Sequence, residues 1–177
     1  MNYSDNYDHI DEYIKNTVND NETLSLVSDF AILWNLYEDE LYGTNYNPRD
    51  LRDEISELGI MNRDDITHDI DLLFDRLKAY LNSKSIFNFR DVIRAYSIRY
   101  KDIHEGELEN IMRGNNCIDK LNFMLLIAAR VRNNMFHGIK GVCDLKNQKE
   151  LFRVCNSVLK MTIDLKIGNG VCKDMKN

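Results

Sequence analysis

The sequence predicts an all-α protein, a bundle of helices packed around one hydrophobic core. Proline occurs once and glycine eight times in 177 residues, so few residues interrupt helices. Apolar residues recur at spacings of three and four over long stretches, which is the pattern of a helix that buries one face. The alternation of apolar and polar residues that is typical of strands is nowhere sustained.

Eight segments are expected to be helical: 5–18, 22–42, 48–58, 63–82, 89–103, 105–113, 117–137 and 146–166. Pro48 suits the first turn of the third segment, and Gly43 and Gly59 suit the positions that follow helix ends. The segment 89–103 also contains valine, isoleucine and tyrosine residues that suit strands. We expect a single domain over residues 1–167 and a polar tail over 168–177.

Composition narrows the class of protein. Hydrophobic residues make up 44 % of the chain and charged residues 29 %, which is typical of globular proteins. The net charge of −6 argues against nucleic-acid binding over the whole surface. No apolar run approaches the ~18 residues of a membrane span, and the acidic N-terminus does not resemble a signal peptide. The sequence therefore predicts a soluble, cytoplasmic protein without membrane contact.

The four cysteines are Cys117, Cys143, Cys155 and Cys172. They form no CxxC pair, and no histidine lies at zinc-ligand spacing from them. The sequence therefore predicts free, partly buried thiols, no metal site and no cofactor.

One window of the chain differs from the acidic remainder. From Lys120 to Cys143 there is no aspartate or glutamate, whereas the window contains Lys120, Arg130, Arg132 and Lys140. A carboxylate-free basic window in an acidic protein predicts a local anion-binding site.

Arg132 interrupts an apolar stripe within this window. The stripe consists of Ile118, Leu121, Leu125 and Ala128. The next position on the same face, four residues later, is Arg132. Because burying an unpaired guanidinium is costly, Arg132 requires an anionic partner or a wet cleft.

A histidine completes the polar cluster. Asn133 and His137 are four residues apart and share a helix face with Arg130. Gly138 suits the position after a helix end, which places His137 at the terminus, where the helix dipole favours its cation. Arg132 and His137 are five residues apart, or about 140° on a regular helix. They converge only if the helix loosens near Gly138, if a ligand spans both, or if a two-fold partner completes the site.

These residue types suit cleavage of a phosphodiester. His137 can exchange a proton near neutral pH, and an arginine can hold a phosphate and offset the charge of the transition state. Asn133 can orient either group. In RNA the 2′-hydroxyl is an available nucleophile, so no metal is required. Stabilisation of a helix end is the alternative interpretation, but it leaves Asn133, Asn134, Lys140 and the stripe position of Arg132 unexplained.

Two segments resemble one known family. "RNNMFHG", Arg132 to Gly138, resembles the R-x4-H signature of HEPN domains, and "RNNMFHGIK" is similar to a form common in defence-linked members. "FAILWNLYEDELYG", residues 30–43, resembles the early HEPN helix. Its matching residues are Trp34, Tyr37, Glu38, Leu41 and Tyr42. Glu38 then either faces solvent or orients a neighbouring histidine or arginine. Residues 60–116 agree only in helical character.

The resemblance implies an HEPN-like helical bundle of four to five core helices with short accessory helices. It implies a homodimer in which two R-x4-H motifs form a composite site, and a metal-independent endoribonuclease that leaves 2′,3′-cyclic phosphate ends. It assigns phosphate stabilisation to Arg132, positioning to Asn133 and acid/base catalysis to His137. Arg130, Asn134 and Lys140 are expected to bind RNA. By this resemblance the protein is expected to act as a toxin or phage-defence effector, and a regulatory or antitoxin partner could bind it.

Two other functions remain open. The chain could be a non-catalytic HEPN module that binds RNA or a partner protein, which needs a dimer face but not His137. It could also be an acidic nucleic-acid mimic that inhibits its target, as carboxylate clusters such as "RDDITHDIDLLFDR" suggest. A mimic needs neither Arg132 nor His137.

Overall fold

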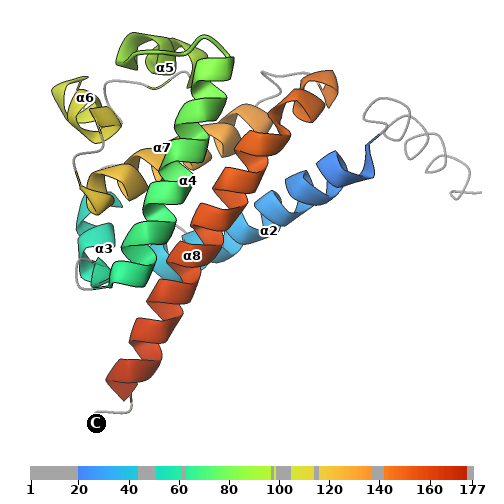
Figure 1. Ribbon diagram of the computed structural model, residues 1–177. Helices are drawn as coiled ribbons and strands as arrows, with labels where there is room; N and C mark the ends of the chain where they lie inside the picture. The colour runs from blue at the N-terminus through green and yellow to red at the C-terminus, as the bar shows by residue number, and fades with distance from the viewer. Residues whose placement is uncertain are drawn as a thin grey trace, which may run out of the picture.

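The computed structural model describes residues 20–43, 51–60, 63–96, 98, 105–113, 116–136 and 142–174. Within these ranges every regular element is a helix and no strand occurs, so the predicted all-α class is confirmed (Figure 1). The helices are α2 (Asn21–Tyr42), α3 (Leu51–Glu57), α4 (Asp64–Ser83), α5 (Phe89–Tyr96), α6 (Glu105–Arg113), α7 (Cys117–Phe136) and α8 (Lys149–Asp174), with a short 3-10 helix (Val142–Gln148) before α8. The helix predicted over 5–18 lies outside the described residues.

Two segments have other bounds than the sequence predicted. In the segment expected to be helical over 89–103, the described helix spans Phe89–Tyr96 and Ile98 is not helical. The last helix was expected over 146–166, but α8 begins at Lys149, after the 3-10 helix, and continues to Asp174. It therefore passes through the expected start of the polar tail at 168, where Ile167 and Gly168 are exposed.

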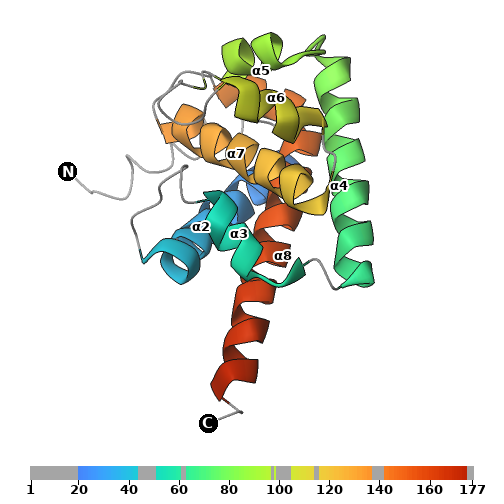
Figure 2. The ribbon, with the colours of Figure 1, turned by 90° about the vertical axis from the view of Figure 1, so that its left-hand side faces the viewer.

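Helix α7 lies at the centre of the bundle (Figures 1 and 2). It contacts α3, α4, α5, α6 and α8. Its nine consecutive residues 121–129 are all buried, so the helix is covered on every side. The stripe inferred from the sequence is therefore too narrow, because a helix that is apolar all round belongs in the interior.

Helices α2 and α8 pack side by side and run in the same direction. Phe30 and Phe152 are fully buried between them, with ring centroids 5.6 Å apart and ring planes 71° apart. Such an edge-to-face pair contributes about 0.5–1.5 kcal/mol beyond the burial of its area. Trp34 and Tyr37 continue this aromatic row along α2, with centroids 5.3 Å apart.

Ion pairs join the first turns of the same two helices. Asp20 caps α2 by accepting hydrogen bonds from the backbone N–H groups of Glu22 (3.1 Å) and Thr23 (3.4 Å). Its carboxylate also pairs with Lys149 of α8, which lies 3.1 Å from Glu22, and Glu22 pairs with Arg153. The hydrogen bond from Lys149 is the main cause that lowers the pKa of Asp20 to about 2.

None of the described helices combines the length and the apolar character that a membrane crossing requires.

The lowered pKa of Asp20 predicts an acid-sensitive contribution to stability. In Asp20→Asn the amide oxygen still caps α2, but the charge that pairs with Lys149 is lost. Because the folded pKa is depressed, the charge stabilises the fold above the ordinary pKa of 3.8, and this contribution is lost as pH falls toward about 2. The melting temperature of the variant should therefore lie below that of the wild type at pH 6, and the gap should be much smaller at pH 2. Asp69→Asn, a change at an exposed position of α4, is the control. A gap of the same size at both pH values would contradict the assignment.

Two glycines that lack nearby atoms should respond oppositely to alanine. At Gly168 and at Gly43 an added Cβ meets no heavy atom within 4 Å, but Gly43 ends α2 with a φ of +54°. Gly168→Ala should stabilise the fold by about 0.5–1 kcal/mol, because alanine restricts the unfolded chain and favours a helix. Gly43→Ala should destabilise it by roughly 1–2 kcal/mol, because a Cβ strains the left-handed conformation. Urea unfolding of both variants measures these changes, and shifts in the same direction would contradict the helical state of Gly168.

Candidate functional site

Five of the seven candidate residues lie in described parts of the chain. Arg130, Arg132, Asn133 and Asn134 occupy the last two turns of α7, and Glu38 lies near the end of α2. His137 and Lys140 follow α7 directly in the sequence and lie outside the described residues.

The guanidinium of Arg132 lies between two acceptors. Its Nη2 atom is 3.7 Å from Oε2 of Glu38, and its Nη1 atom donates a 3.1 Å hydrogen bond to Oδ1 of Asn133. The side chain of Arg132 is 35 % exposed and that of Glu38 is 19 % exposed. Glu38 thus provides a nearby carboxylate for a half-buried cation that the sequence left without a partner.

The packing of α2 explains why Glu38 reaches this position. Trp34, Tyr37 and Leu41 are buried and fix one face of the helix against the core. At 100° per residue, Glu38 lies about 70° from the centre of that face, on its flank rather than opposite to it. A carboxylate on this flank is half-shielded, so its interaction with Arg132 is screened less than that of an exposed surface pair.

The two residues that follow Arg132 differ in their surroundings. Asn133 is partly exposed and holds the arginine through its amide oxygen. Asn134, an expected RNA contact, is buried with only 5 % of its surface exposed. The structure thus brings together Glu38, Arg132 and Asn133, whereas Asn134 lies beneath the surface.

Arg130 has a structural contact that the sequence did not indicate. Its Nε atom donates a 3.0 Å hydrogen bond to the backbone carbonyl of Tyr96, the last residue of α5. The last carbonyls of a helix lack partners within the helix, so this bond satisfies one of them and ties α5 to α7. Arg130 was expected to contact RNA, and this bond gives it a second, structural role.

Arg132 is the group of the described site that could hold an anion, and Glu38 is the carboxylate with which an anion would compete. A guanidinium can hold a phosphate through two parallel hydrogen bonds, and here Asn133 fixes part of its orientation. A bound phosphate would share Arg132 with Glu38. In the described ranges there is no group of three or more histidine, cysteine, aspartate or glutamate side chains that could hold a metal ion.

Two of the cysteines can be placed, and both are buried free thiols. They are Cys117 and Cys155. Burial raises the pKa of Cys155 to about 12, so this thiol stays protonated and unreactive at neutral pH. Cys143 and Cys172 belong to helical segments whose side chains are not described.

Sequence reasoning missed a second cluster of charged residues. Arg76 of α4 lies 2.7 Å from Glu150 of α8, and Glu150 is also 3.3 Å from Arg153. These residues are up to 77 positions apart in the sequence, so no spacing pattern could have related them. Arg76 and Lys78, which lie among the aspartates of α4, were the only available signal.

Comparison of the chain with protein-family models, with curated proteins and with solved structures finds no match.

The hydrogen bond of Arg130 predicts a cost in stability. Arg130→Ala should lower the free energy of unfolding by about 1–2 kcal/mol, because the carbonyl of Tyr96 loses a charged donor. Arg113→Ala is a matched control, since Arg113 forms an exposed 2.8 Å pair with Glu109 within one helix. Pairs of that kind contribute about 0.3–0.5 kcal/mol. Urea unfolding compares the two, and equal losses would show that the bond to Tyr96 contributes no more than a surface pair.

Proposed function

We propose that this chain is a metal-independent endoribonuclease of the HEPN type that acts in the cytoplasm as a toxin or phage-defence effector. The observation that carries the proposal is the half-buried Arg132, held between Glu38 and Asn133 at the end of the central helix. His137 follows five residues later in the "RNNMFHGIK" segment. An oriented arginine and a histidine in one short segment are a combination that suits phosphodiester cleavage.

In the proposed reaction the 2′-oxygen of RNA attacks the adjacent phosphorus. A P–O bond forms to the 2′-oxygen and the P–O5′ bond breaks, so a 2′,3′-cyclic phosphate and a free 5′-hydroxyl result. One imidazole of His137 accepts the 2′-hydroxyl proton or supplies the proton that the departing 5′-oxygen takes up. Arg132 offsets the charge that builds up on the phosphoryl oxygens. Glu38 and Asn133 act through Arg132, by restraining its guanidinium.

A homodimer is part of the proposal. On a regular helix Arg132 and His137 point about 140° apart, so one motif alone does not bring both onto the same phosphate. A two-fold arrangement with the ends of both α7 helices near the axis supplies an arginine and a histidine from different subunits.

The purified protein should cut single-stranded RNA in the presence of EDTA. His137→Ala should lower the cleavage rate by roughly 10²–10⁴-fold through loss of acid/base catalysis. Arg132→Ala should lower it by about 10²–10³-fold through loss of charge stabilisation. Glu38→Gln should cause a smaller loss, because Glu38 acts only through Arg132. Gel assays that resolve cyclic phosphate ends measure these rates, and a 2′-deoxy nucleotide at the cut site should block the reaction.

His68→Ala and Arg113→Ala remove the same side-chain types from exposed positions and are the matched controls. Circular dichroism checks that each variant is folded. A requirement for a divalent metal, equal cleavage of DNA, or full activity in His137→Ala would each exclude this mechanism. RNA binding that needs Arg132 without cleavage would favour the non-catalytic module, and inhibition of a nucleic-acid-binding protein would favour the acidic mimic.

A further inference from the structure

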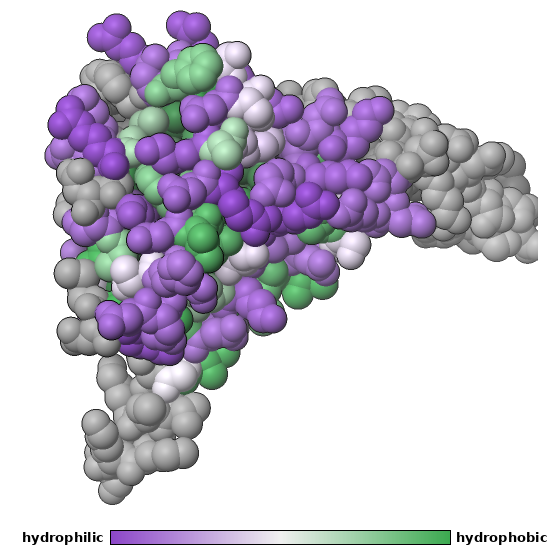
Figure 3. All heavy atoms as spheres, in the orientation of Figure 1, coloured by the Kyte–Doolittle hydropathy of each residue, from purple (hydrophilic) through white to green (hydrophobic). Residues whose placement is uncertain are grey.

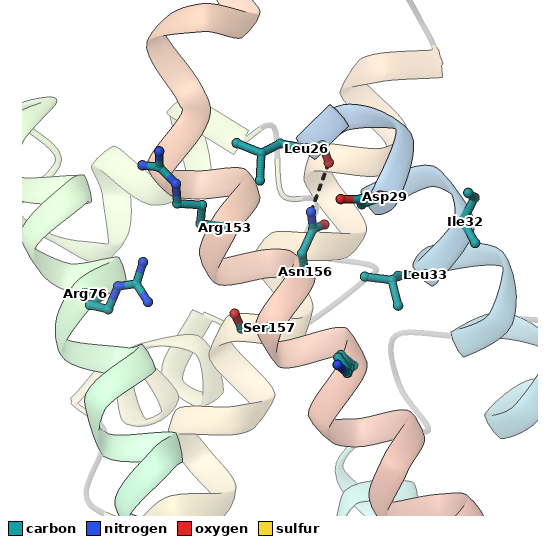
Figure 4. A pocket seen from close by; sticks show the side chains of 9 residues that line it. Leu26, Asp29, Ile32, Leu33, Arg76, Arg153, Asn156 and Ser157 are labelled. Carbon is teal, nitrogen blue, oxygen red and sulfur yellow. Dashed lines mark hydrogen bonds between the residues drawn. The ribbon is translucent and has the colours of Figure 1, made fainter. Parts of the chain in front are cut away.

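A groove crosses the outer face of α8 between α4 and α2 (Figure 4). It has a volume of about 610 Å³, within the range of roughly 300–1,000 Å³ that is typical of small-molecule sites. Figure 3 shows this face of the molecule, where hydrophobic groups lie between largely hydrophilic side chains. The walls of the groove differ in chemistry, and each wall suits a different part of one ligand.

The wall formed by α4 and α8 is cationic. Arg76, Arg153 and Lys160 line it, whereas Asp29 is the one carboxylate among the lining residues. The carboxylate of Glu150 holds Arg76 through Nε (2.9 Å) and Nη2 (2.7 Å). A guanidinium carries five N–H groups, so this contact fixes its position and leaves donors for a second anion. Arg153 is likewise paired, with Glu22 and Glu150, so Lys160 adds the cation of this wall that has no carboxylate partner among the described residues. A phosphate ester can take the remaining N–H donors of the two guanidiniums together with the Lys160 ammonium.

The wall formed by α2 is apolar. Leu26 and Leu33 line it together with Ile32, whose side chain is 61 % exposed, the largest exposed fraction of an apolar residue on α2. In Figure 4 these residues lie across the groove from Arg76. An apolar wall opposite a phosphate site suits the flat face of an aromatic ring.

The polar groups between the two walls are hydrogen-bond acceptors, which a ligand with hydrogen-bond donors would satisfy. Nδ2 of Asn156 donates to the carbonyl of Leu26 at 2.9 Å, which fixes the amide. Its Oδ1 atom is buried and has no hydrogen-bond partner among the described residues. Asp29 adds a second acceptor beside it. Hydroxyl groups of a sugar would satisfy both acceptors.

The geometry points to a binding site for a nucleoside monophosphate in this groove, with its phosphate on Arg76, Arg153 and Lys160, its sugar near Asn156 and Asp29, and its base against α2. The same chemistry occurs at the phosphorylated end of an RNA strand. Because Asp29 and Ile32 lie on the flank of α2 opposite to Glu38, this site is separate from Arg132 and does not depend on ribonuclease activity.

Calorimetric titration with AMP tests the site. AMP should bind the wild-type protein, and adenosine and inorganic phosphate should each bind more weakly, because each lacks one half of the contacts. Lys160→Glu should weaken AMP binding by about tenfold or more. Lys146→Glu reverses an exposed charge outside the groove and should leave it within about twofold. Ser157→Trp, which fills the groove from an exposed position, should abolish binding without removing a charge.

The proposal fails if the wild-type protein does not bind AMP at millimolar concentration, or if Ser157→Trp binds it normally. It also fails if the two lysine variants behave alike, or if Arg132→Ala loses AMP binding while Lys160→Glu keeps it. A 5′-phosphorylated trinucleotide that displaces AMP, where its unphosphorylated form does not, identifies an RNA end as the natural ligand. If the phosphorylated trinucleotide does not displace AMP, the natural ligand is the free nucleotide.

Discussion

The complete burial of α7 is the constraint on which the rest of the structure depends. Nine successive side chains, residues 121–129, are removed from water, and no single neighbour can cover a helix on all sides. Five helices therefore surround it. Three of them, α3, α5 and α6, have seven to nine residues, too few to be stable as isolated helices. They persist because their contacts with α7 bury apolar area, at about 1.5–3 kcal/mol for each large side chain that is fully covered.

The same constraint determines the chemistry at the end of α7. A helix that leaves the core must satisfy polar groups where it reaches the surface, and its two arginines do so in different ways. Arg130 donates a hydrogen bond to the carbonyl of Tyr96 at the end of α5, so this cation satisfies a backbone acceptor. Arg132 instead meets a side-chain carboxylate, at a distance too long for a direct hydrogen bond. This looser contact is the one that an incoming anion can replace, because no backbone group is left unsatisfied when it breaks.

The sequence predicted the helices well wherever their periodicity was long. The bounds of α2, α4 and α7 lie within one residue of the expected segments 22–42, 63–82 and 117–137. Periodicity did not predict how much of α7 is buried, because it indicated a stripe of four residues on a helix that is buried on every side. It also failed at the end of α8, which continues to Asp174 although the apolar periodicity ends near 166 and a polar tail was expected from 168. The contact between Glu38 and Arg132 was one of two alternatives from the sequence. The groove was not foreseen, since Arg76, Arg153 and Asp29 become neighbours only when α2, α4 and α8 pack.

Helix α2 contributes both to the Arg132 site, through Glu38, and to the groove, through Leu26. The contacts that anchor α2 determine which of these two regions is sensitive to salt and pH. Its first turn is held by the ion pairs of Asp20 and Glu22, which are partly open to solvent and which salt and acid weaken. Its middle is held by Phe30 against Phe152, a contact that neither affects. Glu38 lies 18 residues after Asp20, about 27 Å along the helix, and on the far side of the aromatic anchor. Loosening the ion pairs would therefore move the end of α2 beside the groove and leave the aromatic anchor in place. The position of Glu38 beside Arg132 rests on buried apolar area, whereas the wall of the groove near Leu26 rests partly on charge.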